Sequence, residues 1–312
     1  MASFNAINYS LRPSKSVQRH LVFDGLNRLS TVLPIRTSKY LGFGSVWFTD
    51  FLMAHKILGI EEMTSIEGDP IGYCRAVFNK PYSTIDVING MSGDVLVKAV
   101  NPLDITPIIA WLDYDYALDE TVVNDIRFFI ENAPPNSALV VTINGIESKY
   151  GNAQGRPQRL KELLGDVVPD DLSKDSCKDD QLLTTLVTYV SDYMVSIAIE
   201  SARPGGAVPA FKIPYQDGAA MVTIGCILPS SANLVNATDV IRGTAWPGFP
   251  EATIRLPHLT SREVSALQAT QPTRRDLSRT DVQDLGFDLE QTQIDAYKKY
   301  YVHYPMYAQV FT

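Results

Sequence analysis

The stretch Lys39-Tyr40-Leu41-Gly42-Phe43-Gly44-Ser45, followed by Met63-Thr64-Ser65-Ile66-Glu67, decides the fold of this chain. It predicts a short strand, a glycine turn, a helix that Gly59 ends, and a second strand with a carboxylate at its end. Glycines let the backbone approach a ligand, a helix N-terminus offers free N–H groups, and such a carboxylate can accept both hydroxyls of a ribose. The order is typical of the first half of a nucleotide-type cofactor site.

The alternation of strands and helices continues beyond these two strands. Ser45 is placed to cap a helix over about 46–58. A second helix is expected over about 70–79, where Pro81 stops it, and a third strand over 84–88. These elements extend the βα pattern by one more unit.

Two apolar runs then predict central strands. Residues 108–113 and 138–143 are apolar enough to be buried on both faces, as parallel strands are, and Asp119 caps the helix between them. The predicted fold is therefore α/β and Rossmann-like, with a mostly parallel central sheet, helices on both faces and a mid-chain insertion.

The composition changes along the chain define four expected segments. Residues 147–180, the predicted insertion, show no regular apolar period, which is typical of a lid, a binding loop or a disordered insertion. Beyond it we expect a helix over 182–199 and strands over 211–214, 219–228 and 253–256. The segments are an N-terminal helical segment (1–37), a cofactor-binding α/β core (38–146), a polar insertion (147–180), and the remainder of the α/β domain with an aromatic C-terminal tail (181–312).

Overall composition excludes several classes of protein. The 312 residues are 45% hydrophobic and 20% charged, as in ordinary globular proteins, and the net charge of −8 argues against a surface that coats nucleic acid. The three cysteines have no metal-ligand spacing and predict free thiols in a reducing cytoplasm. No signal pattern and no apolar run of roughly 20 residues is present, so we expect a cytoplasmic protein without a membrane span.

The glycine loop restricts the choice of cofactor. A dinucleotide fingerprint needs a third glycine, and Trp47 stands at that position, which disfavours NAD. The Gly-Lys-Ser/Thr ending of a phosphate-binding loop is absent, which disfavours an ATPase.

The arrangement resembles the class I S-adenosylmethionine-dependent methyltransferases, in a form like the O-methyltransferases of bacterial genomes. The resemblance covers about residues 38–145 and rests on the loop Leu41 to Ser45, on Glu67, on Asn89-Gly90-Met91-Ser92 after the third strand, and on Asp113-Tyr114-Asp115-Tyr116 after the fourth. It implies S-adenosylmethionine as the cofactor. The implied cofactor-binding residues are Gly42, Gly44, Ser45, Glu67, Asn89 and Gly90, and the implied catalytic residues are Asp113 and Asp115.

Methyl transfer asks little acid–base chemistry of the protein, because positioning the nucleophile and excluding water supply most of the effect. One of the two aspartates could take a proton from an acceptor hydroxyl or orient the acceptor. The acceptor is a small molecule or a nucleic acid, with oxygen as the expected target atom. The four histidines are scattered, and no metal site is predicted.

Three departures from the family pattern keep a second class of function open. Lys39-Tyr40 stands where the family has an acidic residue, the third glycine is missing, and Asp113-Tyr114-Asp115-Tyr116 lacks the two prolines of enzymes that methylate base amino groups. The alternative is a non-catalytic methyltransferase-like scaffold or a ligand-sensing subunit of a multiprotein complex.

Basic clusters could recruit a partner. We interpret the first as a solvated face of the N-terminal helix, and a nucleic-acid groove would require all three to converge with aromatic side chains. The tyrosine-rich tail is expected to pack against the sheet or a partner subunit, which includes a second copy of the chain. The clusters are Arg12, Lys15 and Arg19; Arg156, Arg159 and Lys161; and Arg274, Arg275 and Arg279.

Overall fold

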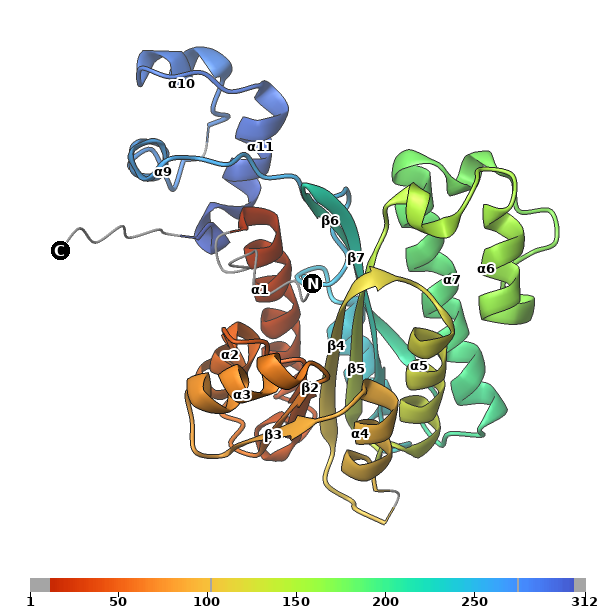
Figure 1. Cartoon of the computed structure of the whole chain (residues 1–312). Helices are drawn as coiled ribbons and strands as arrows, with labels where there is room; N and C mark the ends of the chain where they lie inside the picture. The colour runs from red at the N-terminus through yellow and green to blue at the C-terminus, as the bar shows by residue number, and fades with distance from the viewer. Residues whose placement is uncertain (1–11, 102, 274, 306–312) are drawn as a thin grey trace.

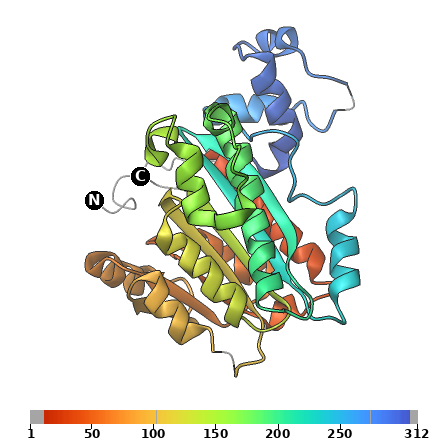
Figure 2. The same ribbon diagram turned by 90° about the vertical axis from the view of Figure 1, so that its right-hand side faces the viewer.

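A computed structural model describes residues 12–101, 103–273 and 275–305, and within them the chain forms a seven-stranded sheet with helices on both faces (Figures 1 and 2). The strand order is β3-β2-β1-β4-β5-β7-β6; neighbours among the first five are parallel, and β7 is antiparallel to both β5 and β6. The predicted fold class is confirmed. The strands are β1 (Lys39–Gly42), β2 (Met63–Glu67), β3 (Ile85–Asn89), β4 (Ile108–Ala117), β5 (Ser137–Asn144), β6 (Val208–Asp217) and β7 (Ala219–Leu228).

Alternate residues of the central strands enter two separate hydrophobic clusters, one on each face of the sheet. Tyr40 and Trp111 belong to the cluster beneath α1, α2, α3 and α8, whereas Leu41 and Leu112 belong to the cluster beneath α4, α5, α6 and α7. This period of two is what a strand buried on both faces requires. The helices are α1 (Pro13–Leu29), α2 (Thr49–Leu58), α3 (Pro70–Asn79), α4 (Ser92–Ala99), α5 (Glu120–Asn132), α6 (Arg156–Leu164), α7 (Asp179–Glu200), α8 (Leu234–Arg242), α9 (Ser261–Gln268), α10 (Arg279–Asp284) and α11 (Gln291–Tyr300).

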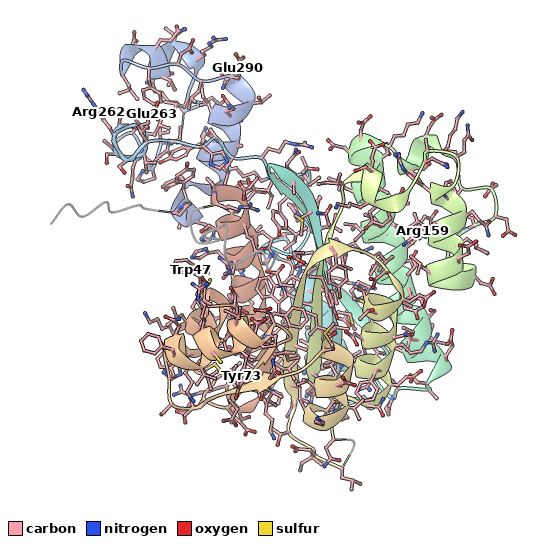
Figure 3. All side chains as sticks on the ribbon, in the orientation of Figure 1. Trp47, Tyr73, Arg159, Arg262, Glu263 and Glu290 are labelled. Atoms are coloured by element: carbon pink, nitrogen blue, oxygen red, sulfur yellow. The ribbon has the colours of Figure 1, made fainter. Side chains whose placement is uncertain are left out.

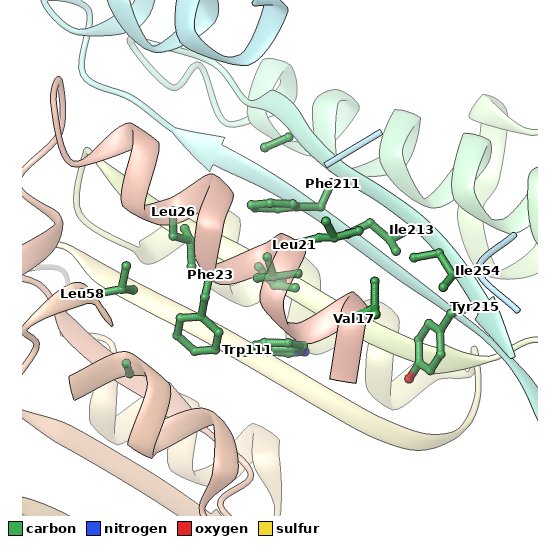
Figure 4. Close-up of a cluster of buried hydrophobic side chains, with 14 of the residues drawn as sticks. Val17, Leu21, Phe23, Leu26, Leu58, Trp111, Phe211, Ile213, Tyr215 and Ile254 are labelled. Carbon is green, nitrogen blue, oxygen red and sulfur yellow. The ribbon is translucent and has the colours of Figure 1, made fainter. Parts of the chain in front are cut away.

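Helix α1 lies across the first face of the sheet and fixes the position of later functional residues. Its apolar side chains, among them Val17 and Leu21, pack with Trp111 of β4 and Phe211 of β6 (Figure 4). At its N-terminus the carboxylate of Asp217, the last residue of β6, accepts hydrogen bonds from the backbone N–H groups of Ser14 (3.0 Å) and Lys15 (2.7 Å). These are two of the donors that a helix leaves unsatisfied at its start.

Several predicted boundaries are wrong. Helix α2 begins at Thr49 instead of 46, because Ser45 has a positive φ of 52° and takes the chain through a turn; Ser45 therefore does not cap the helix. Strand β4 extends to Ala117. The strand expected over 253–256 is a single bridge between Ile254 and Tyr215. The helix cap at Asp119 is confirmed, since its side chain accepts a hydrogen bond from the N–H of Val122.

The insertion over 147–180 is folded, contrary to the expectation of an irregular segment. It contains α6 and three short 3-10 helices. Spaced apolar residues, including Tyr150 and Leu160, are buried against the second cluster, and Arg156 bonds the carbonyl of Cys177 (2.9 Å) and pairs with Glu147. A few apolar anchors among many charges are enough to fold the segment, although they leave no clear period in the sequence.

Helix α7 is the one described helix that is long and apolar enough to cross a membrane by length and composition, with a mean hydropathy of 1.5. In the structure 61% of its apolar window is buried, and it packs on β6 and β7. This is the behaviour of a core helix.

The C-terminal region packs beside α1. Tyr297 of α11 and Tyr304 are buried in the first cluster, and the Tyr304 hydroxyl donates to the carbonyl of Pro257 (2.8 Å) and accepts from the N–H of Leu259 (3.0 Å). Tyr307 of the predicted aromatic tail, and Arg274 of the third basic cluster, lie outside the described residues.

Replacing Asp217 with alanine should destabilise the fold by about 1–2 kcal/mol, because two N-terminal N–H groups of α1 lose their acceptor. Chemical denaturation measures the change, and Asp217→Asn, which keeps one acceptor oxygen, should recover part of it. Equal stability of Asp217→Ala and the unaltered chain would contradict the capping role.

Candidate active site

A cavity of about 480 Å³ opens at the carboxyl ends of the parallel strands. Its walls are the loop after β1, the ends of β2 to β5, the β6–β7 turn and the basic side of α1. Open α/β sheets bind their ligands at this edge. We call it the central cavity.

The glycine loop forms one wall. A Cβ on Gly44 would lie 2.5 Å from the Ser65 Oγ, which accepts the Gly44 N–H at 3.1 Å. Ser45 lines the cavity, and its Oγ is buried without a hydrogen-bond partner in the described chain. Gly42 lies below the surface, where a Cβ would come within 2.9 Å of the Trp111 carbonyl, so it permits close packing with β4. Gly44 and Ser45 therefore face the cavity, and Gly42 supports them.

The ends of β2 and β3 form the adjoining wall. The carboxylate of Glu67 lines the cavity, accepts a hydrogen bond from the N–H of Asp69 (3.2 Å), and has its pKa raised by burial. Gly90 also lines the cavity and donates its N–H to the Glu67 carbonyl (3.1 Å). The Asn89 side chain donates to the same carbonyl (2.9 Å) and is not part of the cavity wall, so its place is beside the site.

A buried carboxylate anchors the loop after β3. Asp125 of α5 accepts hydrogen bonds from the Ser92 hydroxyl, at the start of α4, and from the Tyr114 hydroxyl (2.5 Å), and burial raises its pKa. The Tyr114 ring packs edge-on against Phe43 of the glycine loop, with centroids 5.1 Å apart. This hydrogen-bond network joins two walls of the cavity. The spacing of its residues in the sequence did not predict it.

Asp113 and Asp115 both reach the cavity from β4, where the pairing with β5 is irregular between Asp113 and Ala117. Asp113 pairs with the Lys15 ammonium group, at 2.5 Å between Oδ2 and Nζ. Asp115 is exposed and makes no hydrogen bond or ion pair that involves another described residue. The two predicted catalytic carboxylates therefore differ: one is held by a cation, and the other points to solvent and cavity.

The basic side of α1 is buried, so its interpretation as a solvated face is wrong. Lys15 and Arg19 are each only 6% exposed, and both line the central cavity together with Arg12. Helical spacing places three cations on one side of a helix, but it does not say which side meets the sheet. The basic side chains are evident in the sequence, but only the tertiary contacts show that they face the cavity.

Further site residues were missed. Asp50, in the first turn of α2, accepts a hydrogen bond from the buried Tyr40 hydroxyl (2.7 Å), and burial raises its pKa. Tyr215 is 2% exposed, and its hydroxyl, at the cavity, has no partner in the described part of the chain. Both come from positions whose role depends on long-range packing, and neither belongs to a sequence motif.

The other basic clusters lie elsewhere. Arg159 of α6 lies far from Trp47, which lines the cavity (Figure 3), and α10 lies at the other end of the molecule (Figure 1). Lys161 pairs with Asp170 (3.1 Å), and Arg279 pairs with Asp288 (2.7 Å). The clusters do not converge on one groove. Across the described residues, no group of three or more His, Cys, Asp and Glu side chains could hold a metal ion.

The strand order, the glycine loop and the carboxylate after β2 define the class of Rossmann-like methyltransferases. The sequence model of the family described as "Putative O-methyltransferase" matches residues 7–312, and the chain belongs to that family. That description supports methyl transfer as the general activity. No curated protein matches the sequence closely.

Solved structures with a similar fold include methyltransferases of several organisms. A cofactor-bound protein from MTB, Rv0187, is 16% identical over 66% of this chain and 80% of its own, with a TM-score of 0.36. An arsenic(III) S-adenosylmethionine methyltransferase from Chlamydomonas reinhardtii is 12% identical over 64% and 65%, with a TM-score of 0.40. An O-methyltransferase from Bacillus cereus in complex with SAH is 12% identical over 65% and 80%, with a TM-score of 0.37. Because these scores are below 0.5, the assignment rests on the family match and the strand order.

Replacing Gly44 with alanine should destabilise the fold by about 1–3 kcal/mol, the usual effect of overpacking, because the added Cβ meets the Ser65 Oγ at 2.5 Å and the Phe48 ring at 2.6 Å. Thermal denaturation should show a loss of several degrees. The control Gly93→Ala, in α4, should show no loss, since its nearest contact is 3.4 Å away. Equal melting temperatures for the two variants would contradict the tight fit of Gly44.

Replacing Asp50 with asparagine should stabilise the protein at neutral pH. Burial raises the pKa of Asp50 above 3.8, so the folded state binds the proton more tightly than the unfolded chain, and stability falls as the pH rises through that window. The variant removes this loss, so its advantage should shrink as the pH falls towards 3.8. Urea unfolding of both proteins at several pH values measures it; a constant difference would contradict the raised pKa.

Proposed function

We propose that this protein is an S-adenosylmethionine-dependent methyltransferase that methylates an oxygen atom of a small molecule. The observation that carries the proposal is that Glu67 and Gly90 line the same cavity as Gly44 and Ser45. A carboxylate that faces a glycine loop at the ends of parallel strands suits a ligand with a ribose at one end and a flexible chain at the other.

The residues present fit such a cofactor. The Ser45 Oγ is a buried polar atom without a partner in the described chain, and Gly44 has no room for a side chain between the loop and β2. The Glu67 carboxylate has a single described protein donor, the N–H of Asp69, which leaves acceptor capacity for ribose hydroxyls. The walls therefore offer unsatisfied groups where a ligand would satisfy them.

Each wall has a separate task in this proposal. The glycine loop would hold the amino-acid part of the cofactor, Glu67 the ribose, and Gly90 with Met91 and Ser92 the adenine; all of them line the cavity. When bound, the cofactor supplies a methyl group on a sulfonium, which is a strong electrophile. The chain then needs to orient an acceptor oxygen in line with that methyl group and to exclude water.

The β4 aspartates are the groups that would meet the acceptor. Asp115 makes no hydrogen bond or ion pair that involves another described residue, so its carboxylate can accept the proton that an acceptor hydroxyl releases as oxygen bonds to carbon and the carbon–sulfur bond breaks. Asp113 is held in a fixed orientation by its ion pair with Lys15, which suits a positioning role.

A small-molecule acceptor is favoured over a nucleic acid. A strand or duplex needs a continuous basic surface with several phosphate contacts. Here Lys161 and Arg279 pair with neighbouring acidic side chains, and α6 and α10 lie far apart (Figure 1). Arg12, which precedes α1, and Lys15 and Arg19 of α1 line a cavity of about 480 Å³, which matches the size of a small-ligand site.

Titration with S-adenosylhomocysteine tests the proposal, with NAD and ATP as controls. At about 100 times the dissociation constant, binding should add roughly 2.7 kcal/mol of stability and raise the melting temperature by several degrees. Glu67→Gln should weaken binding about 10- to 100-fold, as expected for hydrogen bonds to a charged group. The exposed neighbour Glu61, replaced in Glu61→Gln, serves as the matched control and should bind as the unaltered chain does.

Failure of S-adenosylhomocysteine to bind would overturn the proposal and favour the non-catalytic scaffold. Binding that Glu67→Gln leaves unchanged would remove the ribose assignment, because the carboxylate would then not contact the ligand.

A further inference from the structure

Two side chains of opposite charge face the central cavity beside the glycine loop without pairing with each other. Arg19 comes from α1 and is 6% exposed, and Asp50 comes from the first turn of α2. No ion pair within 4.0 Å joins them, and the Arg19 side chain forms no hydrogen bond or ion pair with any other described residue. The only side-chain donor to Asp50 in the described chain is the Tyr40 hydroxyl.

Asp50, with Arg19 near it, lies at the part of the cavity where the glycine loop begins. The Asp50 Oδ2 lies 3.4 Å from where a Cβ of Gly42 would stand, and Tyr40 belongs to β1, the strand that leads into the loop. Arg19 is close enough to favour the charged form of Asp50, which partly offsets the effect of burial on the pKa of that carboxyl. Asp50 therefore lies at the start of the glycine loop, and Arg19 lies near Asp50.

Leaving a buried cation and a partly buried carboxylate apart is costly. A charged group removed from water needs a partner with good geometry, and a direct pair would be the simplest solution. A direct pair of this kind forms nearby, since Lys15, 4 residues before Arg19, pairs with Asp113. A separated cation and anion facing one cavity are instead complementary to a ligand that carries both charges on neighbouring atoms.

We infer that Arg19 binds the α-carboxylate, and Asp50 the α-ammonium group, of the amino-acid moiety of the cofactor. The inference rests on the proposed function, since it assigns the methionine end of S-adenosylmethionine to this corner. A guanidinium group suits the carboxylate because its fork can donate two parallel hydrogen bonds. The carboxylate of Asp50 keeps an oxygen for the ammonium group while Tyr40 fixes the orientation of the side chain.

A charge-balancing role for Arg19 is the competing explanation. Arg19 lies near Asp50 and Asp113 and would lower the cost of burying both carboxylates without touching a ligand. In that case replacing Arg19 would disturb the whole site and weaken the binding of every ligand to the same degree. A ligand contact would weaken only those ligands that carry the matching group.

Three thioether ligands separate the two roles. S-adenosylhomocysteine carries both charged groups, S-adenosyl-3-thiopropylamine carries only the ammonium group, and 5′-methylthioadenosine carries neither. Isothermal titration calorimetry gives the affinity of each for the full chain and for its variants. The measurement is binding alone, so it needs no knowledge of the methyl acceptor.

Arg19→Gln should weaken the binding of S-adenosylhomocysteine at least tenfold, as expected for one lost charge-assisted contact. The affinities for the other two ligands should stay within about threefold of those of the unaltered chain. Asp50→Asn should weaken the first two ligands and spare methylthioadenosine. The control Arg28→Gln, on the same helix but paired with Asp24 at the exposed surface, should change none of them.

The possible outcomes distinguish the inference from the proposed function. Equal weakening of all three ligands by Arg19→Gln, or no weakening of S-adenosylhomocysteine, would overturn the inference while the cofactor assignment stands. Absence of binding by the unaltered chain would overturn both. If Arg19→Gln does not fold, Arg19→Lys replaces it; that variant keeps the charge but loses the fork, and it should still weaken S-adenosylhomocysteine several-fold and spare methylthioadenosine.

Discussion

The docking of α1 across the sheet is the constraint on which the site depends. The first turn of the helix is held by two residues far apart in sequence: Asp217 of β6 caps its N-terminus, and Asp113 of β4 pairs with Lys15. Beyond this turn the apolar side of the helix packs on Trp111 and Phe211. With the first turn fixed and the apolar side on the sheet, Lys15 and Arg19 face the cavity, so one helix covers the sheet and also forms a wall of the site.

This arrangement explains the unusual electrostatics of the cavity. Cations from α1 and carboxylates from β4, β2 and α2 face the same space; Lys15 pairs with Asp113, whereas Arg19 and Asp50 form no ion pair with each other. A fold selected for stability alone would pair these charges or replace them with apolar side chains. The raised pKa values of Glu67 and Asp50 reflect the same burial. Sites that must bind a charged ligand keep such groups unsatisfied until the ligand arrives.

The sequence predicted the sheet well because each central strand carries its own local signal. Apolar runs such as 138–143 are buried whatever surrounds them, and Glu67 follows from its place at the end of β2. The side of α1 that faces the sheet could not be predicted, because the partner of Lys15 lies 98 residues away. The sequence position of Ser45 is typical of a helix cap, but its positive φ, next to the close contact of Gly44 with Phe48, takes the chain through a turn. The folded state of 147–180 depends on scattered anchors such as Tyr150, which no window of sequence reveals.

The strand order gives the cavity one end at β1 to β3 and another at β4, β5 and the β6–β7 turn, and this indicates where a methyl acceptor would bind. If the cofactor occupies the ends of β1, β2 and β3, the space left lies at β4, β5 and the β6–β7 turn, where Asn144 and Met221 are paired neighbours. Tyr215 reaches this end, and its hydroxyl has no partner in the described chain. A hydroxyl donor there and the Asp115 carboxylate, which also lines the cavity, would suit an acceptor that offers one acceptor atom for recognition and one hydroxyl for methylation.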